Sequence, residues 1–88
     1  MKVGALLQVK LYKQALKYVN SQDKQTRERF EKAFSDLSQE PPIGDIIPLI
    51  GSPPLMRLRV GDYRVIFYED NGIIKVLKIA PRGQAYNK

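Results

Sequence analysis

Three mainly apolar runs separated by short turns constrain this sequence more than any other feature. The runs are Leu55 to Val60, Tyr63 to Glu69 and Ile73 to Ala80. Gly61-Asp62 separates the first two runs and Asp70-Asn71-Gly72 the last two. Both separators are typical of tight turns, because their glycines are free to adopt a positive φ angle. The sequence therefore predicts three strands in an antiparallel meander.

A strand and two amphipathic helices are predicted before the meander. We expect the strand within Val3 to Leu11, after which apolar residues recur at i, i+3, i+4 and i+7, the spacing of one helix face. These residues are Tyr12, Ala15, Leu16 and Val19 in the first helix and Phe30, Ala33, Phe34 and Leu37 in the second. The polar link from Asn20 to Asp23 is short enough to make a helical hairpin, and Ser21 or Asp23 is the expected cap of the second helix.

Residues 41–54, PPIGDIIPLIGSPP, hold five of the six prolines. Proline lacks the amide donor, so we expect Pro41-Pro42 to end the second helix and the segment to form a loop. Its expected apolar anchors are Ile46, Ile47, Leu49 and Ile50. Too little chain remains on either side for separate cores, so residues 1–88 are predicted to form a single domain. The predicted fold class is α+β, in which an N-terminal strand and a helical hairpin pack on one face of an antiparallel sheet of about four strands.

Arginines gather on one face of the predicted hairpin. Because side chains alternate across a strand, Arg57 and Arg59 point away from the helices. A two-residue turn at 61–62 places Arg59 directly opposite Arg64, at a cost in stability, because like charges facing each other repel. The remaining pairs of this register are Val60 with Tyr63, Leu58 with Val65, and Arg57 with Ile66. Three arginines without an acidic partner in the hairpin predict an anion-binding surface rather than a merely polar one.

The last strand and the tail add further candidates. A two-residue Asn71-Gly72 turn would put Lys78 on the core face, whereas a three-residue turn with a bulge would move it beside Arg64. Burial of an unpaired lysine is costly, so we expect the second register and a fourth cation in the patch. Beyond the strand, Arg82 supplies another cation and Tyr86 a ring able to stack on a base.

Composition narrows the possible chemistry. Fifteen lysines and arginines against nine acidic residues give a formal charge of +6, which favours a polyanionic partner such as nucleic acid. The chain contains neither cysteine nor histidine, which excludes thiol catalysis, zinc sites and imidazole acid–base catalysis. We therefore expect no metal and no cofactor. The apolar stretch at the start is too short for a signal or membrane segment, which predicts a cytoplasmic protein without a membrane partner.

The run LMRLRVGDYRVIFY and the ending PRGQAY resemble the RelE/ParE superfamily of bacterial and archaeal toxins. The order of elements is similar along nearly the whole chain, and the ending is similar to that of archaeal-type members of the RelE branch. For that branch, the resemblance implies the toxin of a type II toxin–antitoxin system, which enters the ribosome and cuts messenger RNA. The catalytic set carried over by position is Arg57, Arg59, Arg64, Arg82 and Tyr86, with Lys78 as an RNA-binding residue.

The chemistry that fits this set is attack of a ribose 2′-hydroxyl on the adjacent phosphate, stabilised by fixed guanidinium groups. We assign Arg64 and Arg82 to the phosphate, Arg57 and Arg59 to activating or orienting the 2′-hydroxyl, and Tyr86 to base stacking. Some family members carry a histidine where this chain has Pro81, so an imidazole mechanism is not available to it. The implied partners are a cognate antitoxin, the ribosome and messenger RNA.

Two other functions remain open from the sequence. Members of the ParE branch share this fold but poison DNA gyrase, and the retained arginines with the terminal tyrosine favour RNA cleavage over that activity. A catalytically inactive relative that only binds RNA or its antitoxin is the third possibility.

Overall fold

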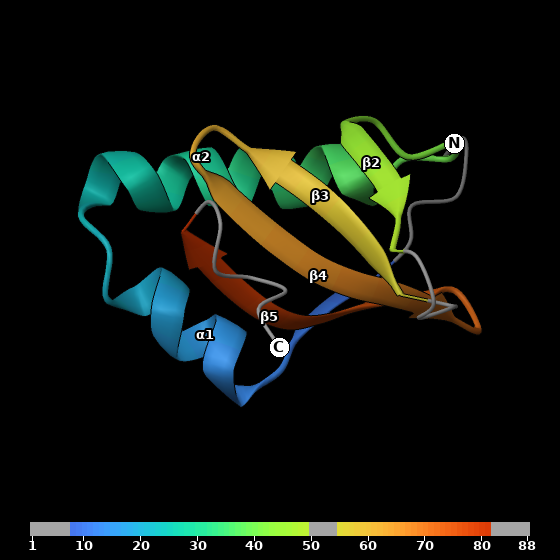
Figure 1. The fold of residues 1–88 in the computed structure, drawn as a ribbon, viewed down its shortest axis with the longest axis horizontal. Coiled ribbons are helices and arrows are strands. Elements are labelled where there is room, and N and C mark those ends of the chain that lie inside the picture. Colours follow the sequence, from blue (N-terminus) through green and yellow to red (C-terminus); the bar gives the residue numbers. More distant parts are fainter. Residues whose placement is uncertain (1–7, 50–54, 82–88) are drawn as a thin grey trace, which may run out of the picture.

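The computed structural model describes residues 8–49 and 55–81 and, within them, packs two helices on one face of a five-stranded sheet (Figure 1). The opposite face carries no helix from these residues and is called the open face below. The elements in chain order are β1 (Gln8–Leu11), α1 (Lys13–Asn20), α2 (Lys24–Leu37), β2 (Asp45–Pro48), β3 (Met56–Val60), β4 (Tyr63–Asp70) and β5 (Ile73–Pro81). Neither helix is long and apolar enough to cross a membrane.

The sheet has the order β1-β5-β4-β3-β2, which confirms the α+β class and differs from the expected sheet at both edges. At one edge, β1 pairs parallel to β5, with Gln8 opposite Ile73, so the sheet is mixed rather than antiparallel. At the other edge, the proline-rich segment contributes a fifth strand, β2, which pairs antiparallel with β3. Proline is tolerated there because alternate amides of an edge strand face solvent and need no hydrogen-bond partner in the sheet.

The meander adopts the expected register between β3 and β4, with all four predicted residue pairs present. Gly61 occupies the first position of the two-residue turn with a φ of 58°, which glycine adopts without strain. Between β4 and β5 the predicted three-residue turn is wrong: Asn71 and Gly72 form a two-residue turn with φ angles of 53° and 79°, the pattern of a type I′ hairpin.

A β-bulge in β5 moves Lys78 off the core face, the effect that was expected of the longer turn. Ile66 pairs with Lys78, whereas the next residue, Phe67, pairs with Val76, so Leu77 is an extra residue on β5. In a regular strand Val76 and Lys78 would share one face. The bulge instead leaves Val76 buried and turns Lys78 out to solvent.

The first helix differs from its predicted face. Ala15 and Val19 are buried as expected, whereas Tyr12 and Leu16 are 37% and 48% exposed. Tyr12 is the residue before the first turn of α1, and Tyr18 packs against the core in its place. The Gln14 side chain holds α1 to β5 through two hydrogen bonds of 3.0 Å, one to the Ile79 carbonyl and one from its amide.

The second helix follows its prediction closely. Asp23 caps it, accepting a hydrogen bond of 2.9 Å from the Thr26 amide. Its buried residues are Phe30, Phe34 and Leu37, with Ala33 partly buried against them. The helix ends at Leu37, before the two prolines, and the Ser38 amide donates to the carbonyls of Phe34 and Ser35.

The core between the helices and the sheet fixes which strand residues face outward. It contains buried side chains from β3, β4 and β5: Leu58, Val65, Phe67, Ile74, Val76 and Ile79. Phe30 lies 5.1 Å from Tyr63 and 6.1 Å from Phe34 between ring centroids, joining α2 to the start of β4. Since alternate residues point to opposite faces, burial of Leu58 and Val65 obliges their neighbours Arg57, Arg59 and Arg64 to face the open side.

Candidate functional site

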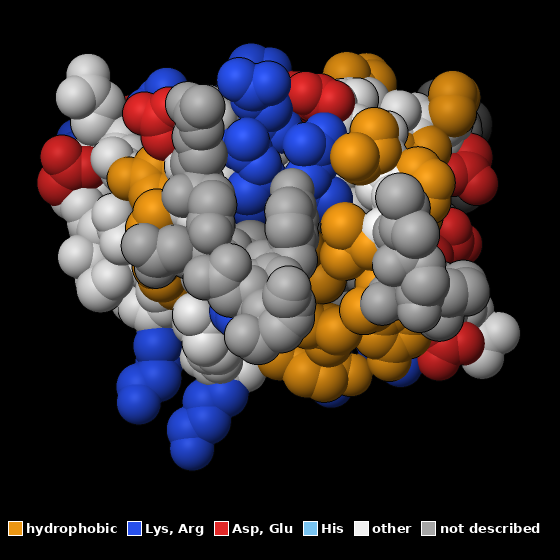
Figure 2. All heavy atoms as spheres, viewed as in Figure 1, with side chains coloured by type: hydrophobic (Ala, Val, Ile, Leu, Met, Phe, Trp, Pro, Cys, Tyr) orange, Lys and Arg blue, Asp and Glu red, His pale blue; other side chains and the backbone are white. Residues whose placement is uncertain are grey.

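Cationic side chains from three adjacent strands meet on the open face. We use the name arginine patch for Arg57 and Arg59 of β3, Arg64 of β4 and Lys78 of β5. Figure 2 shows lysine and arginine side chains gathered over the upper part of β3 and β4, with hydrophobic side chains beside them. Three of the predicted catalytic residues and the predicted RNA-binding lysine therefore lie on one surface.

Arg57 faces away from the helices as predicted, but it is largely buried there. Its cross-strand neighbours are Ile47 on β2 and Ile66 on β4, and it is only 9% exposed between them. Its Nη2 donates a hydrogen bond of 3.2 Å to Oδ1 of Asp45, so it has an acidic partner from outside the hairpin. Within the described residues, its buried Nε has no hydrogen-bond partner.

Arg59 and Arg64 form the like-charged pair that the register predicts. Their Cα atoms are direct partners across β3 and β4, with Arg59 exposed and Arg64 half-buried. Arg64 donates one long hydrogen bond of 3.4 Å to the neighbouring Tyr63 carbonyl. Within residues 8–49 and 55–81, no carboxylate lies within 4.0 Å of either guanidinium. The pair is therefore available to bind an anion, which would also relieve the repulsion between the two arginines.

Lys78 lies diagonally from Arg64, because Arg64 pairs with Ala80 and Lys78 with Ile66. It is exposed on the open face, as predicted for a fourth cation of the patch. A bulge in β5, rather than a longer turn, puts it there. A small apolar cluster lies beside the cations, formed by Ile66 and Ala80 with Leu49 and Leu55. Apolar surroundings strengthen the attraction between fixed cations and a bound anion.

Arg82 and Tyr86, the other two predicted catalytic residues, lie outside the described residues. Their assignment rests on the sequence alone.

The other end of the open face holds Lys75, a cation that is already paired. Lys75 lies 3.0 Å from Asp70, and this hydrogen bond raises the pKa of Lys75. Its ammonium also lies 5.7 Å from the centre of the Tyr68 ring. A hydrogen bond with Tyr12 raises the pKa of Tyr68 above its ordinary value. These partners distinguish Lys75 from Arg59, Arg64 and Lys78.

Asp45 is the site residue that the sequence did not reveal. It begins β2, directly opposite Arg59, and its side chain is 53% exposed beside the Arg57 guanidinium. The segment PPIGDIIP reads as a loop, and nothing in it indicates that Asp45 and Ile47 face the arginines. Recognition of a strand at 45–48 would have been the signal, since it would have placed alternate residues beside β3.

Comparison with known proteins identifies related sequences and folds. A family model described as the ParE toxin of type II toxin-antitoxin system, parDE, matches residues 9–86. A chain of the archaeal RelE-RelB complex from Pyrococcus horikoshii OT3 is 38% identical, with a TM-score of 0.76 over 91% of this chain and 99% of that chain. No curated protein sequence matches.

Two more distant structures share the fold. A chain of the RelB-RelE antitoxin-toxin complex from Methanococcus jannaschii is 18% identical, with a TM-score of 0.67 over 81% of this chain and 87% of that chain. A chain of the toxin-antitoxin complex RelBE2 from Mycobacterium tuberculosis is 22% identical, with a TM-score of 0.67 over 88% of this chain and 99% of that chain.

Proposed function

This chain belongs to the RelE/ParE family of type II toxin–antitoxin toxins, and from this premise we propose that it is a ribosome-dependent endoribonuclease that cleaves messenger RNA. The observation that carries the proposal is the pairing of Arg59 with Arg64 across β3 and β4. A fold gains nothing from two like charges in direct opposition, whereas a phosphate between them would be held from both sides.

The proposed reaction is attack of a ribose 2′-oxygen on the adjacent phosphorus, which breaks the bond to the 5′-oxygen of the next nucleotide. The products are a 2′,3′-cyclic phosphate and a 5′-hydroxyl. Negative charge on the phosphoryl oxygens grows in the transition state, so fixed cations stabilise it more than the ground state. Arg64 and Arg82 would contact the phosphate, Arg57 and Arg59 would orient the 2′-hydroxyl, and Tyr86 would stack on a base.

The ribosome has a definite part in this mechanism. The arginine patch lies on a sheet face that no helix of the described residues covers. In-line attack requires the 2′-oxygen, the phosphorus and the leaving oxygen to be aligned, and such orientation is worth roughly 7–11 kcal/mol. A ribosome that holds the messenger in a splayed conformation would supply it, so free RNA should be a poor substrate. Action on translating ribosomes would place the protein in the cytoplasm.

An antitoxin is the second proposed partner. The similar structures include complexes of RelE with RelB, among them the archaeal one at 38% identity. We propose that this toxin likewise binds a RelB-like antitoxin, which covers the arginine patch and keeps it from RNA.

Inhibition of DNA gyrase is the competing function, because the matching family model is named for the ParE toxin. The uncompensated arginine pair supports RNA cleavage, since binding to a protein surface does not require clustered phosphate ligands. An inactive relative that binds RNA or its antitoxin would keep the patch but show neither activity.

Two assays on the purified protein test the proposal. In primer extension on translating ribosomes, we expect new 5′ ends within the coding sequence, while the same messenger without ribosomes stays intact. In a supercoiling assay, we expect gyrase to remain active. An intact messenger together with inhibited gyrase would establish the competing function, and no effect in either assay would indicate the inactive relative.

A further inference from the structure

Asp45 is an acidic residue on the edge strand β2, beside the arginine patch. Its Oδ1 accepts the hydrogen bond of 3.2 Å from Arg57, and its own backbone is paired with Arg59. Its side chain nevertheless stays 53% exposed, so part of the carboxylate is open to solvent on the open face.

We infer that Asp45 is the general base of the RNA-cleaving reaction, accepting the proton of the attacking 2′-hydroxyl. The inference rests on the proposed function and names a residue that the family resemblance did not supply. It assigns the proton transfer to β2, next to the guanidinium groups that hold the phosphate.

The chemistry of the surrounding residues points to this role. Attack by a 2′-hydroxyl requires an acceptor for its proton, and the chain has no histidine or cysteine. The guanidinium of arginine stays protonated and only donates, so the arginines of the patch are poor acceptors. In the described part of the chain, the open face carries two strand carboxylates: Asp45 beside the patch and Asp70 at the far end of β4, six residues beyond Arg64. Its place at the far end of β4 separates Asp70 from the patch, so Asp45 is the carboxylate beside the arginines.

The hydrogen-bonding groups of Arg57 and Asp45 are complementary to a hydroxyl rather than to a phosphodiester. A hydroxyl both donates and accepts a hydrogen bond, whereas the oxygens of a phosphodiester only accept. Asp45 is the acceptor of the pair, and the Arg57 guanidinium is the donor. The 2′-hydroxyl is the group in RNA that would use both.

The step balances as follows. The 2′-hydroxyl proton passes to the Asp45 carboxylate while the 2′-oxygen forms its bond to phosphorus and the bond from phosphorus to the 5′-oxygen breaks. The leaving oxygen takes a proton from water, and Asp45 returns its own proton to water. The net reaction neither releases nor consumes a proton, and it needs no oxidant, reductant or metal.

Protonation of Asp45 at acid pH should therefore stop the reaction. The charged groups facing it are Arg57 and Arg59 on β3, with Arg64 one strand further on β4. All three are arginines, which donate hydrogen bonds and do not accept them, so the carboxylate is the proton acceptor among these groups.

Asp45→Asn, Asp45→Glu and Asp70→Asn form the test set. Asparagine keeps the size of the side chain but cannot accept the proton, whereas glutamate restores a carboxylate on a longer arm. Asp70→Asn is a matched control, because Asp70 lies on the same face, is 52% exposed and bonds a cation at 3.0 Å. Each protein is compared with the parent in single-turnover cleavage of ribosome-bound messenger across a pH series, with ribosome affinity and the denaturation midpoint measured in parallel.

We expect Asp45→Asn to bind ribosomes at least as tightly as the parent and to cleave about 10²–10⁴-fold more slowly. Its rate should also lose the rise with pH that the parent shows in the acid range. Asp45→Glu should recover part of the rate together with that rise, and Asp70→Asn should match the parent.

Three results would overturn the inference. Asp45→Asn at the parent rate would show that the carboxylate is not needed. An equal loss at every pH, with the parent's profile retained, would make Asp45 only a support for Arg57. Loss in proportion to the unfolded fraction would make its role structural. A parent that cuts no messenger on ribosomes would instead overturn the proposed function, and the inference with it.

Discussion

Replacement of Arg64 by alanine separates catalysis from stability in the arginine patch. Arg64 faces Arg59 across the strands and donates a single hydrogen bond, of 3.4 Å, within the described residues. If Arg64 binds the scissile phosphate, the change removes a contact that matters most in the transition state. If Arg64 is a structural residue, the change removes packing and leaves the chemistry otherwise intact.

The two expectations differ in size. Loss of one oxyanion-type contact costs about 10²–10³ in rate, or roughly 3–4 kcal/mol. For folding, relief of the cross-strand repulsion gains about 0.2–1 kcal/mol. The lost hydrogen bond and the lost contact of the half-buried stem act in the opposite direction by a similar amount. The net change in stability should therefore stay within about 1 kcal/mol, which corresponds to a Tm shift below about 4–8 °C for a domain of this size.

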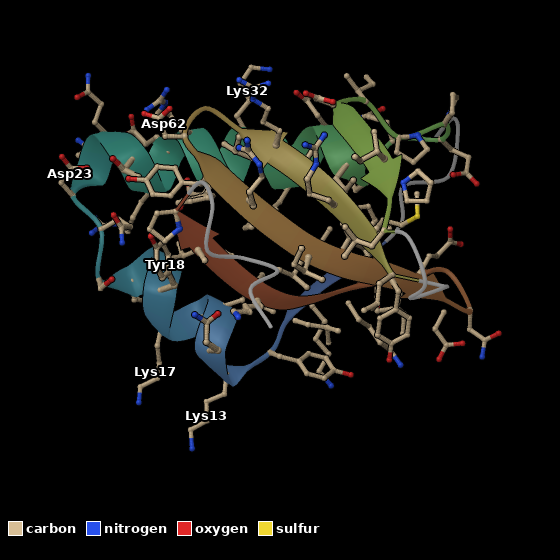
Figure 3. The ribbon with its side chains drawn as sticks, viewed as in Figure 1. Lys13, Lys17, Tyr18, Asp23, Lys32 and Asp62 are labelled. Carbon is tan, nitrogen blue, oxygen red and sulfur yellow. The ribbon has the colours of Figure 1, made fainter. Side chains whose placement is uncertain are left out.

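The assay compares single-turnover cleavage on saturating ribosomes with thermal denaturation of the same preparation. Lys13→Ala is the control, since it removes one positive charge from α1, where Lys13 and Lys17 extend away from the rest of the molecule (Figure 3). We expect Lys13→Ala to cleave at the parent rate. An Arg64→Ala protein that cleaves like the parent, or one that unfolds far below it, would refute the assignment of Arg64 to the phosphate.

Three further predictions concern binding, metal and folding. Ribosome affinity should fall as the salt concentration rises. Arg59→Ala should reduce the slope of log affinity against log salt by roughly 0.7–0.9, which corresponds to the loss of one phosphate contact. An affinity that does not depend on salt would contradict this prediction. EDTA should leave cleavage unchanged while ribosomes are kept assembled, because the proposed step uses arginine and aspartate side chains, and a strict metal requirement would overturn that mechanism. Asp23→Ala should lower the denaturation midpoint, because Asp23 caps α2 and hydrogen bonding to Thr26 lowers its pKa. That stabilisation should be complete above the pH at which an unfolded aspartate ionises and should vanish as the pH falls through the lower folded pKa; urea melts of both proteins at neutral and acid pH test this.

Local signals explain why the meander was predictable. Gly61-Asp62 and Asn71-Gly72 fix tight turns, and alternation along β3 and β4 then determines which side of the sheet each residue faces. The opposition of Arg59 and Arg64 follows from these two facts alone. Helix α2 was equally predictable, because the spacing of its apolar residues and its capping residue both indicate a helix over the same segment.

The features that sequence reasoning missed depend on contacts between distant residues. The parallel pairing of β1 with β5 joins residues 65 positions apart, such as Gln8 and Ile73, and no local pattern encodes it. Strand β2 is stabilised by β3 rather than by its own proline-rich sequence, so Asp45 was not recognised as a neighbour of Arg57. The bulge at Leu77 similarly arises from packing, since it lets both Val76 and Ile79 reach the core.

The most direct test of the central claim uses a single modified messenger. Primer extension first locates the bond that the purified toxin cuts on translating ribosomes, and the nucleotide on its 5′ side is then replaced by its 2′-deoxy analogue. If the arginine patch promotes attack by the 2′-hydroxyl, the modified messenger stays intact at that bond while the unmodified one yields a 5′-hydroxyl end. Cleavage of the deoxy messenger at the same bond would contradict the account.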